Sequence, residues 1–138
     1  MELSVPGAIA LTALWAAAGV MAAPQSPQEV QRAIESEARQ TQSGFAGFST
    51  QAGEQFFRST HGNDWSCASC HTPEPRNAGR HAKTGKDIAP LAPAANPERF
   101  TNLDKVEKWF KRNCGDVLGR PCTAQEKGNV LVYLLSLK

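Results

Sequence analysis

Apolar residues recur at helical spacing in four stretches of the chain. The first, residues 27–41, follows Ser26-Pro27-Gln28-Glu29, which combines an N-cap serine, a proline at the first helical position and a glutamate three residues after the cap. The second, residues 50–59, brings Gly53 and the aromatic pair Phe56 and Phe57 onto neighbouring turns. Each pattern predicts an amphipathic helix.

Two further helices are predicted nearer the C-terminus. One begins at a Thr101 cap and ends at Gly115, and the other opens with a capping box over residues 123–126 and runs to the end of the chain. Between the second and third helices, residues 72–97 are rich in proline and glycine, so regular structure there must be short. Because no strand-like alternation of useful length occurs, the pattern predicts an all-α fold with four or five helices.

The start of the chain forms a separate unit. The apolar run over residues 6–23 is short for a membrane span and ends in small residues, as in a secretory signal peptide cleaved near Ala22. The only charged residue before this run is Glu2, so an uncleaved membrane anchor is the alternative. The predicted division is a signal peptide at 1–22, an N-terminal helix and linker at 23–48, and the main domain at 49–138.

Composition narrows the class of protein. Of the 138 residues, 41% are apolar and 20% are charged, which is typical of a globular domain. The formal net charge of +2 creates no strong field, so neither nucleic acid nor an anionic membrane is expected as a principal partner. Once the signal peptide is cleaved, no stable membrane insertion is expected. Both methionines, Met1 and Met21, precede the predicted cleavage site, so the mature chain contains none.

The segment Cys67-Ala68-Ser69-Cys70-His71 is a C-x-x-C-H motif, the attachment pattern of a c-type haem. Thiols three positions apart can add to the two vinyl groups on one porphyrin edge, and the next imidazole then reaches the iron. A thioredoxin-like dithiol normally follows a strand, and a zinc site needs further paired ligands. The motif therefore predicts one covalent haem c on Cys67 and Cys70, with His71 as the proximal iron ligand.

Cytochromes c commonly use a methionine as the second axial ligand of the iron. Because the mature chain contains no methionine, another group must fill this sixth position or leave it open. The candidates are His61, His81, a lysine, Tyr133, an asparagine, or no protein ligand. A lone histidine outside a ligand cluster usually has a surface or hydrogen-bonding role. A second strong ligand would instead make the protein an ordinary six-coordinate electron carrier.

The order of helix, C-x-x-C-H, proline-rich loop and two helices resembles the class I cytochrome c fold. Longer motifs are similar to those of the SHP (sphaeroides haem protein) family of high-spin monohaem cytochromes c. The resemblance covers roughly residues 45 to 138. The motifs lie at residues 65–72, 84–93, 96–101, 106–114 and 122–128.

The resemblance implies that an asparagine, matched to Asn96, is the sixth ligand of the oxidised iron. A neutral, hard amide oxygen suits ferric iron better than ferrous iron, so reduction is expected to release it. Pro93 and Pro97 bracket Asn96 and restrict its loop. The residues alone favour a different role, in which Asn96 caps the turn or helix that Pro97 begins.

The same resemblance implies a periplasmic protein that accepts electrons and binds diatomic gases, O2 or NO, at the reduced iron. Its expected partners are a dihaem cytochrome c and a membrane cytochrome b. An enzyme that reduces oxygen or oxidises nitric oxide at the open iron is a further alternative.

Two other groups of residues carry chemistry. Cys114 and Cys122 flank a short turn, and in an oxidising compartment such a pair is expected to form a disulfide, as the SHP resemblance also implies. Two free thiols are the alternative.

The simplest interpretation of the basic side chains that follow the C-x-x-C-H motif is a solvated face. The alternatives are that they anchor haem propionates or dock an acidic partner. They are Arg76, Arg80, Lys83 and Lys86.

Overall fold

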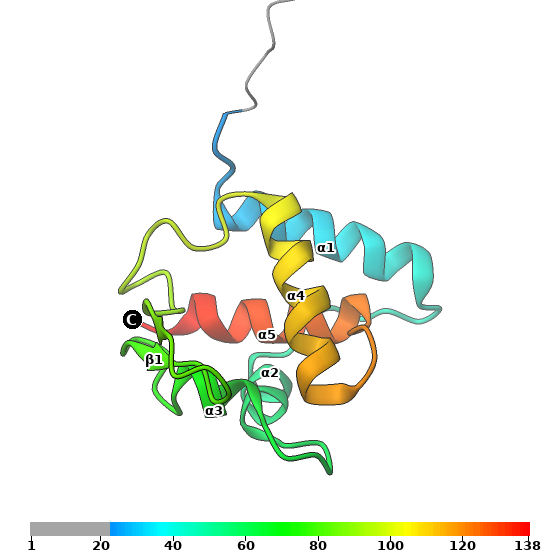
Figure 1. Cartoon of the computed structure of the whole chain (residues 1–138). Coiled ribbons are helices and arrows are strands. Elements are labelled where there is room, and N and C mark those ends of the chain that lie inside the picture. Colours follow the sequence, from blue (N-terminus) through cyan, green and yellow to red (C-terminus); the bar gives the residue numbers. More distant parts are fainter. Residues whose placement is uncertain (1–22) are drawn as a thin grey trace, which may run out of the picture.

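A computed structural model describes residues 23–138, so the predicted signal peptide, residues 1–22, lies outside the described residues. The described part is all-α, as predicted, with one very small sheet (Figure 1). Its elements are α1 (Pro27–Thr41), α2 (Thr50–Arg58), α3 (Cys67–His71), β1 (Gly79–Arg80), β2 (Asp87–Ile88), α4 (Leu103–Leu118) and α5 (Ala124–Ser136).

Capping residues set the starts of three helices where the sequence predicts them. Ser26 and Glu29 form a reciprocal capping box at α1, and Thr123 and Glu126 form another at α5. The hydroxyl of Ser49 accepts a hydrogen bond from the Ala52 amide at the start of α2. Local side-chain chemistry therefore fixes these boundaries before any tertiary contact is considered.

The predicted ends of α4 were wrong at both termini. The Thr101 hydroxyl donates to the Glu98 carbonyl, and Asn102 caps the helix instead, accepting from the Lys105 amide at 2.8 Å. The helix continues through Gly115 to Leu118 and ends at Gly119, which has a φ of +69°. A glycine inside a helix costs only about 1 kcal/mol, and burial of Val117 in the last turn outweighs that cost.

The crossing of α2 over α5 is the closest helix contact in the fold. A Cβ atom on Gly53 would lie 1.9 Å from the Asn129 carbonyl oxygen, so only glycine allows the two backbones to approach this far. Next to the crossing, the rings of Phe57 and Tyr133 have centroids 5.7 Å apart. The glycine and aromatic residues that the sequence pattern brings onto neighbouring turns of this helix therefore lie at its crossing with α5.

Helix α1 packs along the other side of α5 (Figure 1). Val30, Ile34 and Leu131 are fully buried in this contact. Lys127 of α5 is also buried, and its Nζ donates to Glu37 of α1 at 2.7 Å and to Glu107 of α4 at 2.8 Å. One ammonium group thus joins three helices.

The pKa of Lys127 reflects these contacts. Burial alone would lower it, but the hydrogen bonds and charges of Glu107 and Glu37 outweigh burial and raise the pKa above the ordinary value for lysine.

The proline-rich segment contains a short hairpin that the sequence pattern did not indicate. β1 and β2 pair antiparallel, with Gly79 opposite Ile88 and Arg80 opposite Asp87. Strands this short leave no alternation to detect.

No helix within residues 23–138 is both long and apolar enough to span a bilayer.

Candidate functional site

Helix α3 is a single turn that holds the C-x-x-C-H motif. Ser66 and Ser69 exchange hydrogen bonds across it, since the Ser66 amide donates to Ser69 Oγ at 2.9 Å and the Ser69 amide donates to Ser66 Oγ at 3.2 Å. Cys67 and Cys70 are half-buried free thiols on this turn. The helix therefore presents both sulfurs on one short, capped element, as attachment to a single porphyrin edge requires.

His71 ends α3 as a half-buried residue whose Nδ1 atom is fully buried. Burial lowers its pKa to about 4, with smaller contributions from the charges of Arg99 and His81, so the ring is neutral at physiological pH. Its Nδ1 atom is buried and has no hydrogen-bond partner within residues 23–138. Neutral imidazole is the form that ligates metals, and an unpaired buried ring nitrogen calls for a partner from outside the polypeptide. These features fit a haem ligand.

The thiols do not fit the two competing interpretations. Burial raises the pKa of Cys67 to about 11, whereas redox-active C-x-x-C motifs work through a thiol of lowered pKa. Structural zinc needs four protein ligands, and the described part of the chain contains no group of three or more His, Cys, Asp or Glu residues placed to hold a metal ion. The haem interpretation remains.

The proline-rich segment is tied directly to α3. A Cβ atom on Gly79 would lie 2.0 Å from the Cys70 carbonyl oxygen, so β1 packs against the backbone of the motif. In the hairpin turn, the Ala82 amide lies 3.3 Å from Cys70 Sγ. Further on, the Pro75 carbonyl accepts from the Leu91 and Ala92 amides at 2.9 and 3.0 Å. Residues 72–97 thus wrap around the motif, as their composition predicts.

The predicted ligand Asn96 lies on this wrapping segment. Its Nδ2 donates to the Pro90 carbonyl at 3.2 Å, which orients the amide and leaves its oxygen, the atom predicted to ligate iron, outside that bond. The Arg99 Nε donates to the same carbonyl at 2.9 Å. The structure therefore places Asn96 on the segment that wraps His71, half-buried and turned back toward Pro90.

The other residues considered for the sixth position are engaged elsewhere. His61 Nε2 is 2.9 Å from the Phe56 carbonyl oxygen. His81 Nδ1 accepts from two amides of its own turn, at 3.2 and 3.3 Å. Tyr133 is 3% exposed, within the contact between α2 and α5. The hydrogen-bonding role expected for a lone histidine is confirmed at both positions.

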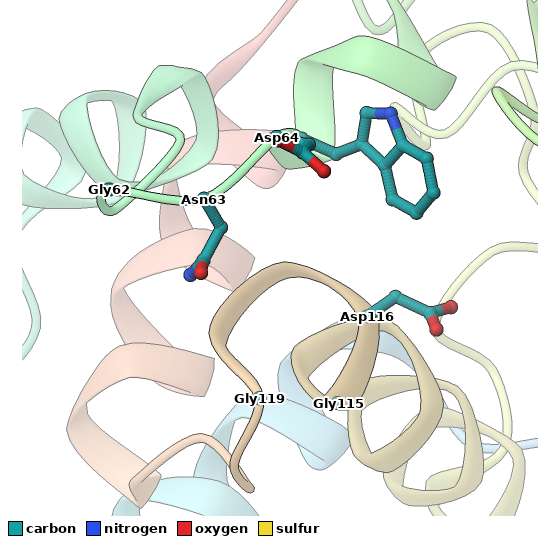
Figure 2. Close-up of a pocket in the computed structure, with 7 residues that line it drawn as sticks. Gly62, Asn63, Asp64, Gly115, Asp116 and Gly119 are labelled. Carbon is teal, nitrogen blue, oxygen red and sulfur yellow. The ribbon is translucent and has the colours of Figure 1, made fainter.

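A pocket of about 300 Å³ lies between the residues just before the motif and the last turn of α4. Figure 2 shows Asn63 and Asp64 on one wall and Asp116 on the other. Trp65, two positions before Cys67, also lines the pocket. The Asn63 Nδ2 donates to the Val117 carbonyl at 2.9 Å and bridges the two walls.

The flank of α4 beside this pocket has an unusual composition. Trp109, Asn113 and Asp116 follow one another at helical spacing, and Trp109 is the one large apolar side chain among the described residues that is strongly exposed, at 52%. Asn113 is half-buried. The i, i+4 and i+7 spacing of these three residues is the sequence signal that marks this flank of the helix.

The disulfide prediction is confirmed. Cys114 in α4 and Cys122 just before α5 are bonded, with Cα atoms 5.6 Å apart. The bridge fixes the end of α4 against the start of α5, directly after Asn113.

The basic side chains after the motif are spread over an exposed surface and partly neutralised. Arg76 Nε lies 2.9 Å from Glu74 Oε1, and Arg80 Nη2 lies 3.0 Å from Asp87 Oδ1. The Lys83 ammonium lies 5.2 Å from the centre of the Trp65 ring. These contacts fit the interpretation of this surface as a solvated face better than its interpretation as one strongly positive patch.

Comparison with known proteins shows the family. A family model described as "Domain of unknown function (DUF1924)" matches residues 43–134. The chain belongs to this family. The proteins to which the chain is similar link this family to SHP, which the sequence motifs also resemble.

Two characterised relatives are cytochromes c. The chain is 49% identical over 80 residues to cytochrome c'' of Methylophilus methylotrophus, covering 58% of this chain and 56% of that protein. It is 52% identical over 69 residues to the cytochrome c-type protein SHP of Cereibacter sphaeroides, covering 50% and 53%. The chain thus spans little more than half the length of the curated relatives it matches.

The solved structures agree with the sequence matches. Oxidised SHP, described as an oxygen-binding cytochrome c, superimposes with a TM-score of 0.73 at 38% identity over 83% of this chain and all of that one. The SHP resemblance and the class I cytochrome c fold are therefore confirmed.

Proposed function

We propose that this chain is a periplasmic c-type haem protein that accepts electrons and binds a diatomic gas when its iron is reduced. The observation that carries the proposal is the capped turn of α3, where two free thiols precede a half-buried imidazole whose Nδ1 atom is buried and unpaired. Oxygen binding is described for SHP, a relative of the same fold.

Each residue of the motif has a distinct role in this proposal. Cys67 and Cys70 hold the haem through thioether bonds, and His71 supplies the proximal imidazole. When bound, the haem supplies one-electron redox chemistry and, once reduced, an open position for a small gas. The low pKa of His71, about 4, means that no proton has to leave the ring before it ligates.

We propose that an asparagine amide occupies the sixth position in the ferric state and leaves on reduction. Asn96 is the ligand predicted from the sequence, and its bond to the Pro90 carbonyl orients its amide. Haem-ligand detachment is described for the solved cytochrome c''. An amide oxygen is suited to such detachment because it binds ferrous iron weakly.

A specific observation favours a second amide, that of Asn113. It shares a flank of α4 with the exposed Trp109, beside the pocket that Trp65 lines. An exposed tryptophan on this flank of α4 marks a face that a large apolar group could cover. Asn113 and Asn96 therefore both enter the test of the sixth ligand.

The cellular setting follows from two features. The predicted signal peptide directs export, and the bond between Cys114 and Cys122 suits an oxidising compartment such as the periplasm. We propose a dihaem cytochrome c and a membrane cytochrome b as the electron donors, on the basis of the SHP resemblance.

Two rival functions make different predictions. An electron carrier with two strong ligands would be low-spin when reduced and would not bind gas. Its best candidates, His61 and His81, already make hydrogen bonds within the protein. An enzyme would consume supplied oxygen or nitric oxide under steady reduction, whereas a gas-binding protein would bind it in stoichiometric amount.

The experiment combines mass spectrometry with one optical titration. Protein matured in a host that attaches haem c should carry the mass of one haem, and its reduced form should be high-spin and bind carbon monoxide rapidly. An unmodified mass would overturn haem attachment. A low-spin reduced spectrum that ignores carbon monoxide would overturn gas binding while leaving the cytochrome assignment intact.

A further inference from the structure

The exposed side of α4 carries positive charges that have no partner in the described part of the chain. These exposed cations lie within about two helical turns and are Lys105, Lys108, Lys111 and Arg112. The ion pairs found within residues 23–138 include none of them. The one carboxylate between Lys105 and Arg112 is Glu107, which is bound to Lys127 of α5 at 2.8 Å. The middle of α4 therefore presents positive charge to solvent.

Three of these cations share one side of the helix. Lys105, Lys108 and Arg112 are spaced i, i+3 and i+7, which places them on neighbouring turns of a single face. We call this surface the basic face of α4. The exposed carboxylates of the helix, Asp104 and Asp116, lie toward its two ends, so they border the basic face rather than interrupt it.

The basic face adjoins the proposed haem site. The Arg112 guanidinium lies 5.2 Å from the centre of the Trp109 ring, on the flank of α4 that also carries Asn113. One turn further along, Asp116 lines the same pocket as Trp65, two positions before the first cysteine of the attachment motif. Because a helix rises about 1.5 Å per residue, Lys105 lies within about 17 Å of Asp116 along the axis. A protein bound on the basic face would therefore lie beside the proposed haem site.

The basic side chains of the hairpin offer less unpaired charge. Arg80 pairs with Asp87 at 3.0 Å, while Lys83 and Lys86 stay outside the ion pairs found in the described chain. These lysines belong to a turn, whereas the cations of the basic face are fixed in register on a long helix. An acidic surface therefore finds its best complement on α4.

We propose that the basic face of α4 is the docking surface for an acidic electron-donor protein. The inference rests on the proposed function, since it requires electrons to reach this chain from a protein donor. Charge complementarity carries it, because opposite charges steer a partner toward one side of a protein and fix its orientation there. Salt screens such steering, with a screening length of about 10 Å at 0.1 M and about 3 Å at 1 M.

The test measures how fast the ferric holoprotein is reduced by flavodoxin hydroquinone, an acidic one-electron donor protein, in a stopped-flow instrument. One electron passes from the anionic flavin hydroquinone to ferric iron, which leaves the neutral semiquinone and ferrous iron without proton transfer. Lys105→Glu combined with Lys108→Glu should lower the second-order rate constant about tenfold at low ionic strength. This difference from the wild type should disappear in about 1 M salt.

A matched control reverses the same number of charges on the hairpin. Lys83→Glu combined with Lys86→Glu should lower the rate constant less than about threefold. Lys105→Gln combined with Lys108→Gln removes charge without reversing it, and it should give a loss of about threefold even if the doubly reversed variant does not fold. Arg112 is left unchanged in every variant so that Trp109 keeps its neighbour.

Three results would overturn the inference. The first is a rate constant that neither α4 variant changes. The second is an equal or larger loss in the hairpin variant, which would show an effect of net charge or docking at the hairpin. The third is unchanged flavodoxin kinetics together with wild-type binding to phosphatidylglycerol vesicles that the α4 variants lose, which would assign the basic face to an anionic membrane.

Failure of this inference is distinguishable from failure of the proposed function. Absence of covalent haem from the wild-type protein, or a reduced form that ignores carbon monoxide, would contradict the function itself. Normal haem attachment, complete reduction by dithionite and normal carbon monoxide binding, with flavodoxin kinetics unchanged in the α4 variants, would contradict only the docking surface.

Discussion

The helical frame and the wrapping segment are held together by different forces. The frame of α1, α2, α4 and α5 is stabilised by close packing, with Ile34, Phe57 and Leu131 fully buried. The wrapping segment, residues 72–97, is fixed mainly by hydrogen bonds to its own carbonyls, such as those of Pro75 and Pro90. Changes in the frame should therefore alter stability, and changes in the segment should alter the haem.

The largest effect is expected where the frame is tightest. Gly53→Ala would place a Cβ atom 1.9 Å from the Asn129 carbonyl oxygen and 2.9 Å from Tyr133 Cβ. Because backbone must move to relieve this overlap, the free energy of unfolding should fall by about 3 kcal/mol or more. Denaturant unfolding followed by circular dichroism measures the change.

Gly115→Ala is the matched control, since its added Cβ meets nothing within 4 Å. It should raise stability by about 0.5 to 1 kcal/mol, as expected for alanine replacing glycine inside a helix. Similar losses in both variants would show that the crossing of α2 and α5 is not the tight point of the frame.

The next effect concerns the disulfide. Replacing Cys114 and Cys122 together by serine should lower the free energy of unfolding by about 2 to 3 kcal/mol, because the bridge closes a short loop in the unfolded chain. The haem spectrum should change little if Asn96 is the ferric ligand. A large change confined to the oxidised spectrum would instead favour Asn113, whose neighbour in α4 is Cys114.

A smaller loss is expected from Lys127→Met. It would leave Glu37 and Glu107 facing each other without the cation, but both carboxylates are partly exposed, so about 1 to 2 kcal/mol should be lost. Thermal or denaturant unfolding at neutral pH measures it.

The pH dependence of Lys127 has a defined sign. Its pKa is raised above the ordinary value of 10.5, so its contribution is fully present below that pH and is lost as pH rises through the folded-state value. The stability difference between wild type and Lys127→Met should therefore shrink in strongly alkaline solution. A difference that stays constant from neutral to alkaline pH would contradict the ion-pair explanation.

The smallest effect on stability, and the largest on the spectrum, is expected in the wrapping segment. Asn96→Ala removes one hydrogen bond to Pro90 and should cost about 1 kcal/mol. If Asn96 ligates ferric iron, the oxidised spectrum should change and the reduced spectrum should not. Asn113→Ala is the parallel variant, and whichever of the two alters only the oxidised form identifies the ligand.

Much of the fold could be predicted because its signals are local. A capping box is complete within four residues, so the starts of α1 and α5 follow from Ser26, Glu29, Thr123 and Glu126 alone. The C-x-x-C-H motif is equally local, since one turn of chain contains both thiols and the imidazole. Gly115 shows the limit of such signals, because burial of Val117 extends α4 past a residue that often ends a helix.

The helices, the haem-attachment motif and the family could all be predicted from the residues alone. The pairing of distant groups became visible only in three dimensions: Lys127 with two carboxylates, Trp65 with the end of α4, and Arg99 with the carbonyls of Ala89 and Pro90. The physical reason is that a cap or a motif acts over a few bonds of chain. Burial and charge act through space, and no periodicity along the sequence records which side chains the fold brings within their range.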